Sequence, residues 1–62
     1  MKTADHFAFE VADLDAALDF YCGTLGLKLL SRETDEVHGE AFAFLELAGG
    51  NLELLQLLRP GP

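Results

Sequence analysis

The first predicted element is a strand over residues 6–11, where apolar and polar positions alternate. One side of this strand is apolar and is formed by Phe7, Phe9 and Val11. The other side is formed by His6, Ala8 and Glu10. We expect the apolar side to pack against another part of the protein. The other side carries two titratable groups on one short strand, which indicates a wet cavity rather than a sealed core.

A helix is predicted to follow this strand. Asp13 stands at the N-cap position, where its carboxylate can accept the free backbone N–H groups of the first turn. Apolar residues then recur at three- and four-residue spacings and predict one buried stripe, formed by Leu14, Ala17, Leu18, Tyr21 and Leu25. Gly23 or Gly26 can end the helix, because glycine readily takes the left-handed conformation of a C-cap.

Three more strands are predicted, over residues 27–34, 40–48 and 52–58. The polar segment 35–39 predicts a hairpin connection, and Gly-Gly-Asn at 49–51 predicts a second turn. A helix remains an alternative for 40–48, which is rich in strong helix formers, and on periodicity alone for 52–58. The tight turn and the stop at Pro60 favour a strand for 52–58, with residues 59–62 as a C-terminal tail.

The last strand contains a carboxylate within a leucine-rich run. Alternation predicts one face with Glu53, Leu55 and Leu57. It predicts the opposite face with Leu52, Leu54 and Gln56. Because an unpaired buried charge is costly, we expect Glu53 to be paired, protonated or bound to a metal.

The size of the chain limits what it can bury. Its 62 residues form one domain, and such a chain buries only about 60% of its unfolded surface. A single cysteine, Cys22, excludes an internal disulfide, which leaves a metal or oligomerisation as the means of stabilisation. Half of the residues are hydrophobic, so we expect an apolar surface that pairs with a second copy.

The net charge of −7, with four basic residues, argues against nucleic acid and against anionic membrane surfaces as partners. No apolar run approaches the ~20 residues needed to span a bilayer, and no basic-plus-apolar signal segment opens the sequence. We therefore expect a cytoplasmic protein.

Several of these residues together resemble a known module. They are Asp5-His6 opening a strand, then Asp13-Leu14, Ala17, Phe20-Tyr21, Leu25-Gly26-Leu27 and the segment AFAFLELAGGNLELLQ. Over residues 4–58 the chain resembles a βαβββ module of the vicinal oxygen chelate superfamily, which includes glyoxalase I, bleomycin-resistance proteins and extradiol dioxygenases. The resemblance implies an α+β fold with a mixed, curved four-stranded sheet, and a second copy that completes a cup-shaped cavity.

The resemblance also implies a site. His6 and Glu53 match the positions of metal ligands in metal-using members, and Glu10 should face the same cavity. Family members usually combine two modules, whereas residues 1–62 form one. The chain is therefore either a half-length fragment or one half of a homodimer in which His6 and Glu53 of both copies converge on one metal. A mixed nitrogen and oxygen set suits Ni, Co, Mn, Fe or Zn.

By the same resemblance, the predicted function is a metal-dependent glyoxalase-type lyase or isomerase that acts on a small carbonyl substrate through a metal-chelated enolate. Glu53 is the candidate general base, and Glu10 is a second candidate base or substrate contact. The acidic cavity lacks the Arg or Lys that would hold a thiol tripeptide or a CoA substrate. The alternatives are a metal-free small-molecule-binding protein of the bleomycin-resistance type and an inactive half-length module.

Three other features of the sequence are not assigned to the predicted site. His38 lies in a polar loop beside Glu36 and Glu40 and is expected to be exposed. Cys22 lies beside the apolar stripe and is interpreted as a structural thiol. Phe42 and Phe44 share one face of their strand and are expected to lie in the core or in a dimer interface.

Overall fold

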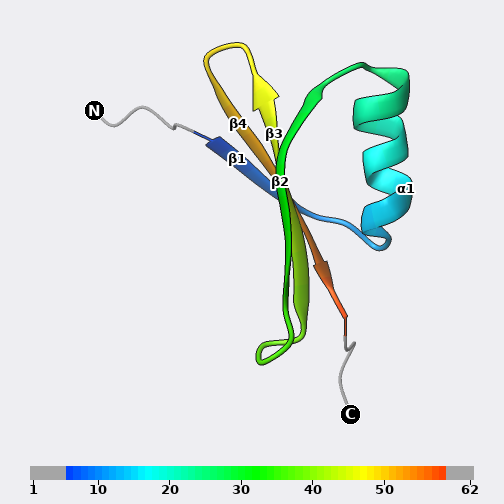
Figure 1. Ribbon diagram of the computed structural model, residues 1–62, viewed down its shortest axis with the longest axis vertical. Helices are drawn as coiled ribbons and strands as arrows, with labels where there is room; N and C mark the ends of the chain where they lie inside the picture. Colours follow the sequence, from blue (N-terminus) through cyan, green and yellow to red (C-terminus); the bar gives the residue numbers. More distant parts are fainter. Residues whose placement is uncertain (1–5, 59–62) are drawn as a thin grey trace.

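A computed structural model describes residues 6–58, with the backbone alone at His6, so the predicted tail at 59–62 lies outside the described residues. The chain forms the predicted βαβββ order (Figure 1). The elements are β1 (His6–Glu10), α1 (Leu14–Leu18), its π-helical continuation η1 (Asp19–Thr24), β2 (Lys28–Asp35), β3 (Glu40–Leu47) and β4 (Gly50–Leu57). The helical alternatives for 40–48 and 52–58 are therefore wrong, because both segments are strands.

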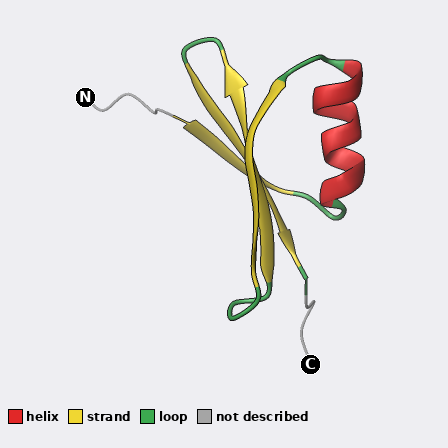
Figure 2. Cartoon of the chain, viewed as in Figure 1, coloured by secondary structure: helices red, strands yellow, loops and turns green. Residues whose placement is uncertain are grey.

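The strands form one open sheet of four, in the order β1-β4-β3-β2, with β1 and β2 at its edges. Strand β1 runs parallel to β4, whereas β3 is antiparallel to both of its neighbours. The helix covers one face of this sheet, and no element of residues 6–58 covers the other (Figure 2). The predicted α+β module with a mixed sheet is confirmed.

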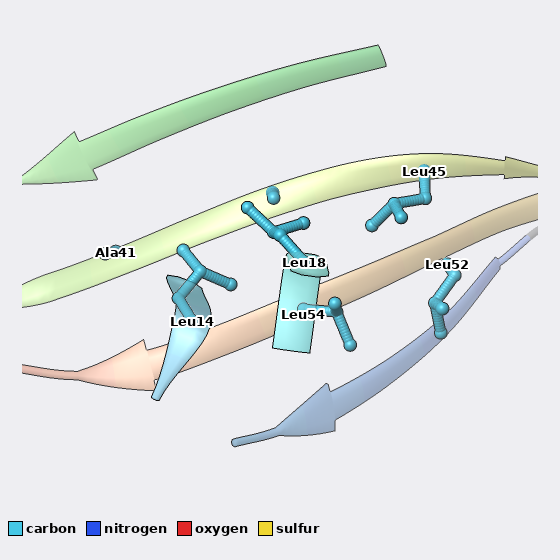
Figure 3. Close-up of a cluster of buried hydrophobic side chains, with 7 residues drawn as sticks. Leu14, Leu18, Ala41, Leu45, Leu52 and Leu54 are labelled. Carbon is cyan, nitrogen blue, oxygen red and sulfur yellow. The ribbon is translucent and has the colours of Figure 1, made fainter. Parts of the chain in front are cut away.

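The core lies between the helix and the two central strands (Figure 3). It consists of Leu14 and Leu18 from α1, Ala41, Ala43 and Leu45 from β3, and Leu52 and Leu54 from β4. Ala43, Leu45 and Leu54 are completely buried. Small side chains at two of the three β3 positions leave room for the helix leucines, so the helix packs close to the sheet.

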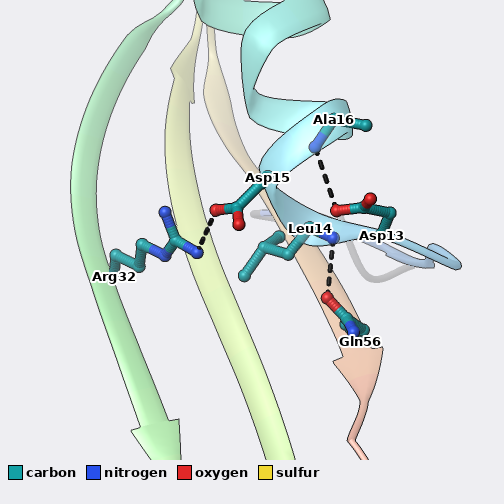
Figure 4. Close-up of polar contacts among 6 residues, drawn as sticks. All are labelled: Asp13, Leu14, Asp15, Ala16, Arg32 and Gln56. Carbon is teal, nitrogen blue, oxygen red and sulfur yellow. Dashed lines mark hydrogen bonds and ion pairs between the residues drawn. The ribbon is translucent and has the colours of Figure 1, made fainter.

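Two side chains satisfy the first backbone N–H groups of the helix (Figure 4). Asp13 is the N-cap as predicted, and its Oδ1 accepts a hydrogen bond from the N–H of Ala16 at 3.1 Å. The N–H of Leu14 donates to Oε1 of Gln56 at 2.7 Å. The second bond joins the start of the helix to β4 and fixes how the helix lies on the sheet.

The helix ends at Thr24 with Leu25 as its C-cap, and Gly26, one of the two predicted glycines, follows with a positive φ of 78°. Before that residue the helix widens, and the N–H of Leu25 bonds to the carbonyl of Phe20, five residues earlier. The wider turn rotates later residues away from the stripe, and Leu25 is 54% exposed. The prediction that Leu25 belongs to the buried stripe is therefore wrong, although Leu14 and Leu18 are buried.

The apolar side of β1 is only partly covered. Val11, just after the strand, packs against the core, but Phe7 and Phe9 are each 55% exposed. Within residues 6–58 the two phenylalanines are therefore only partly covered, and what else this side packs against stays a prediction. Their positions at an edge strand, beside β4, explain the exposure, because the helix contacts β3 and β4.

Candidate functional site

The sheet face opposite the helix, called the open face below, carries Glu53 near its middle. Glu53 lies on β4, with Ala8 of β1 beside it on one side and Phe44 of β3 on the other. Residues that pair in register point to the same face of a sheet, so these three positions are direct neighbours. Glu53 is half-buried, and no hydrogen bond or ion pair joins its carboxylate to the side chains of residues 7–58.

The backbone of β1 places position 6 on the open face. His6 pairs in register with Asn51, two residues before Glu53 on β4. With the usual strand spacing and rise, the Cα atoms of His6 and Glu53 are about 8 Å apart. This separation suits two long side chains that reach a common ion, and it agrees with the predicted pair of ligands. Ligation by His6 and Glu53 stays a prediction.

Glu10 also lies on the open face, at the other end of β1. It pairs with Leu55 and is exposed. Its Cα is about 8 Å from that of Glu53 by the same spacing. The open face therefore brings both predicted catalytic carboxylates within reach of one small molecule, and their roles stay a prediction.

The surroundings of Glu53 differ from those that the leucine-rich sequence suggests. Leu52 and Leu54 lie on the helix face and are buried in the core, so neither contributes to an apolar setting for the carboxylate. The apolar neighbours on the open face are Phe44, which pairs with Glu53, and Leu55, which follows two positions along the strand. Alternation along the strand separates residues that are adjacent in sequence.

Phe42 and Phe44 form an aromatic pair on the open face. Their ring centroids are 6.1 Å apart, with an edge-to-face angle of 81°. Both rings are half-buried and lie outside the buried core, which uses the alanines on the other face of β3. Of the two expected positions, the core is therefore wrong, and a dimer interface stays a prediction.

The candidate donors of one chain were compared with the needs of a metal ion. Among the side chains of residues 7–58, no group of three His, Cys, Asp or Glu is placed to hold an ion. Position 6 and Glu53 together provide one nitrogen and one oxygen donor, which is half of a tetrahedral set. The chemistry of this pair fits a metal only if a second set of donors faces it.

His38 lies away from this face, at the turn between β2 and β3, and its side chain is 71% exposed as expected. It pairs with Asp35 rather than with Glu36 or Glu40, through a 2.7 Å contact between Nδ1 and Oδ2. The hydrogen bond to Asp35 raises the pKa of His38 and lowers the pKa of Asp35. His38 is exposed and Asp35 is half-buried at the turn, so this pair organises the turn and takes no part in the site.

Cys22 lies beside the apolar stripe, as the sequence predicts. The thiol of Cys22 is free, half-buried and packed against the core, which fits the structural role assigned to it. Over the described part of the chain, none of the helices has the length and apolar character needed to cross a bilayer.

These strands and helix define an α+β protein of the βαβββ class, with the helix on one face of an open mixed sheet. The sequence places it in a family. Residues 3–62 match the model of the Glyoxalase/Bleomycin resistance protein/Dioxygenase superfamily, and the chain belongs to that superfamily. The resemblance found in the sequence is confirmed.

Solved structures with the same fold include two informative relatives. A hypothetical protein from Bacillus halodurans C-125 is 38% identical, with a TM-score of 0.80 over 92% of this chain and 41% of its own. Methylmalonyl-CoA epimerase from Mycobacterium tuberculosis is 32% identical, with a TM-score of 0.75 over 89% of this chain and 38% of its own. Among curated proteins no match was found.

A third relative was solved with a ligand. A variant of the Streptomyces coelicolor methylmalonyl-CoA epimerase, in complex with 2-nitronate-propionyl-CoA, is 34% identical. Its TM-score is 0.75, over 89% of this chain and 44% of its own. The present chain thus spans about two fifths of the length of these relatives.

Proposed function

We propose that the chain, as one module over residues 1–62, pairs with a second copy to form a metal-dependent isomerase or lyase of the glyoxalase type. The observation that supports this proposal is the environment of Glu53. Its carboxylate is half-buried at the centre of the open face and has no hydrogen-bond partner among the side chains of residues 7–58. A half-buried carboxylate is stabilised by a cation or a proton. The cation is the alternative that the proposed chemistry uses, because a metal ligand and a general base must both be ionised.

In this proposal, His6 and Glu53 of each copy hold the metal. One imidazole nitrogen and one carboxylate oxygen from each copy give a mixed set that suits Ni, Co, Mn, Fe or Zn. When bound, such an ion supplies Lewis-acid stabilisation to a carbonyl and an adjacent oxygen of the substrate. His6 and Glu53 of one copy supply two donors, so a set of four donors requires both copies.

The remaining steps fall to the chain's own groups. A carboxylate oxygen of Glu53 or Glu10 takes a proton from the carbon beside the substrate carbonyl and returns it. Ala8, between position 6 and Glu10 on β1, has a small side chain that leaves space for the substrate. Phe44 and Leu55 flank Glu53 and exclude water from one side of that proton transfer.

The substrate is expected to be a small carbonyl compound rather than a CoA thioester. The open face is acidic, with carboxylates from four strands at Glu10, Glu33, Glu40, Glu46 and Glu53. Within residues 6–58, Lys28 is the one basic residue that the register assigns to this face, at the outer strand β2. The phosphates of CoA would face several negative charges and little to neutralise them.

The test combines native mass spectrometry with metal titration of the purified chain. We expect two chains with one bound ion in the wild type, and a loss of metal affinity of at least about tenfold in His6→Ala and in Glu53→Gln. Glu46→Gln is the matched control, because Glu46 is an exposed carboxylate on the same face and should leave affinity unchanged.

Retention of metal by both His6→Ala and Glu53→Gln would overturn the proposed site. A dimer that takes up no metal but binds small molecules would instead identify a metal-free binding protein of the bleomycin-resistance type. Isomerase activity is then assayed with small α-carbonyl compounds, and Glu10→Gln separates a base from a ligand, because loss of a base lowers kcat without loss of metal.

A further inference from the structure

Residues that pair in register on adjacent strands form rows across the open face. The row next to the turn between β3 and β4 is polar on every strand. Its members are His6 on β1, Asn51 on β4, Glu46 on β3 and Lys28 on β2. Asn51 is exposed and belongs neither to the core nor to the proposed proton transfer. Its place in this row indicates another role.

Few side chains lie beside position 6 on the open face. Strand β1 is at the edge of the sheet, so among the described strands its neighbour is β4 alone. The next residue of β1 on this face is Ala8, which cannot form a side-chain hydrogen bond. On β4, Asn51 is the direct partner of position 6, and Glu53 is a diagonal neighbour. Asn51 and Glu53 are therefore the nearest hydrogen-bonding side chains to position 6 among residues 7–58.

The two nitrogens of an imidazole need different partners. A histidine that binds a metal with one ring nitrogen nearly always donates the N–H of the other to a carboxylate, a carbonyl or water. In the proposed function Glu53 binds the metal, so Asn51 is the neighbour that remains for the second nitrogen of His6. Paired residues on adjacent strands lie about 4.8 Å apart, so the short side chain of Asn51 reaches Nδ1, the ring nitrogen nearer the backbone. Nε2 then extends farther from the sheet, toward the metal.

The amide of Asn51 can accept or donate, and Glu46 decides which end faces β1. The amide has one oxygen that accepts and one NH2 group that donates. Glu46 pairs with Asn51 from the opposite side, on β3, and an ionised carboxylate only accepts. Glu46 therefore favours the NH2 group, and Oδ1 turns toward β1. Lys28 pairs with Glu46 in turn, and opposite charges directly across two strands stabilise each other.

We propose that Asn51 is a positioning residue for His6, and that its Oδ1 accepts the hydrogen of Nδ1. This bond fixes the orientation of the ring and leaves Nε2 as the nitrogen that binds the metal. The inference rests on the proposed function and adds which nitrogen is the ligand and what holds it. Asn51 itself contacts neither the metal nor the substrate. Because the bond needs no metal, it can be tested apart from the function.

The test is NMR spectroscopy of the metal-free chain, labelled with ¹⁵N. The ring nitrogen shifts report which nitrogen carries the hydrogen, and the chain has two histidines, so His6 is assigned from the spectrum of His6→Ala. At about pH 8.5, roughly two units above the usual pKa of histidine, the ring is neutral. We expect Asn51→Ala to lower the ratio of Nδ1–H to Nε2–H at His6 by about two- to tenfold, the effect of one typical hydrogen bond.

Two variants serve as controls for this ratio. Asn51→Asp keeps an acceptor oxygen at the same place, so the wild-type ratio should be retained. Ser31→Ala removes a different exposed polar group from the open face, on β2 beside Phe44, and should leave the ratio unchanged. Circular dichroism checks that each variant is folded, which we expect because Asn51 and Ser31 are both exposed.

Metal titration is the second readout. We expect a loss of affinity of about tenfold in Asn51→Ala, the usual effect of removing the partner of a ligand histidine. Asn51→Asp should retain the affinity of the wild type or exceed it. Glu46→Gln should retain it as well, because glutamine keeps an oxygen that accepts from the amide of Asn51.

The outcomes separate this inference from the proposed function. A tautomer ratio that is unchanged in Asn51→Ala, or lowered equally in Asn51→Asp, would overturn the positioning role whether or not metal binds. A lowered ratio with unchanged metal affinity would also overturn it. A ratio lowered in Asn51→Ala and restored in Asn51→Asp, in a chain whose wild type binds no metal, would support the bond and contradict the metal-dependent function.

Discussion

Replacing Gln56 by methionine tests whether one long-range hydrogen bond holds the helix on the sheet. Oε1 of Gln56 accepts the N–H of Leu14 at 2.7 Å, across 42 residues of sequence. Methionine has a similar length and keeps the apolar contacts, but it leaves this first helical N–H without an acceptor. An orphaned buried donor costs about 1–3 kcal/mol. Leu14 is 1% exposed, so water replaces the lost acceptor poorly, and we expect about 2 kcal/mol.

That loss is large for so small a domain. At 0.05–0.15 kcal/mol per residue, a chain of this length has a free energy of unfolding of roughly 3–9 kcal/mol. The assay is urea unfolding followed by circular dichroism at one fixed protein concentration, because pairing would make stability depend on concentration. With a slope of about 1 kcal/mol/M, the midpoint should fall by about 2 M.

Gln56→Glu is the control, since glutamate keeps an oxygen acceptor and places a negative charge at the positive end of the helix. At pH 7 its stability should lie within about 1 kcal/mol of the wild type. If Gln56→Met were as stable as the wild type to within about 0.5 kcal/mol, the hydrogen bond would contribute nothing net. The account of how the helix is fixed would then be refuted.

Two further predictions concern the core and the hairpin turn. Leu54 is completely buried, so Leu54→Ala should cost about 2–5 kcal/mol and remove most of the urea transition, whereas the exposed Leu57→Ala should cost much less. Because the pKa of His38 is raised, its stabilising pair with Asp35 is fully present below the ordinary value of 6.5 and is lost as pH rises through the folded value. Because the pKa of Asp35 is lowered, the same pair is present above its ordinary value of 3.8 and is lost as pH falls through the folded value. An NMR titration of His38 should therefore show a lower pKa in Asp35→Asn than in the wild type.

Local chemistry made much of the fold predictable. The N-cap at Asp13 was recognisable because a short carboxylate before an apolar stripe accepts the first N–H groups. The alternation around Glu53 gave the correct face for each residue of β4. Features that depend on contacts between distant segments were not predictable. The acceptor role of Gln56, 42 residues from Leu14, has no signal in local sequence.

The errors have physical causes. The widened helical turn at residues 19–24 moved Leu25 out of the stripe, because a 3.6-residue period no longer holds there. The apolar side of β1 is only partly covered within residues 6–58, because the strand order places it at an edge where the helix does not reach. For the site, the sequence predicted that position 6, Glu10 and Glu53 share one face, and the register agrees. A single chain cannot reveal whether those groups meet their counterparts in another copy.

The two faces of the sheet differ in what they carry: the helix face carries the hydrophobic core, and the open face carries the candidate site residues. The helix face holds the leucines and alanines of the core, so substitutions there act on the free energy of unfolding. The open face holds carboxylates and an aromatic pair, and none of its side chains belongs to the buried core of the described chain. Changes at Glu10 or Glu53 should therefore alter metal and substrate binding at nearly constant stability. Phe7 and Phe9 belong to neither group, since they lie on the helix side of the edge strand β1, beside the buried Leu52 and Leu54, and are each 55% exposed.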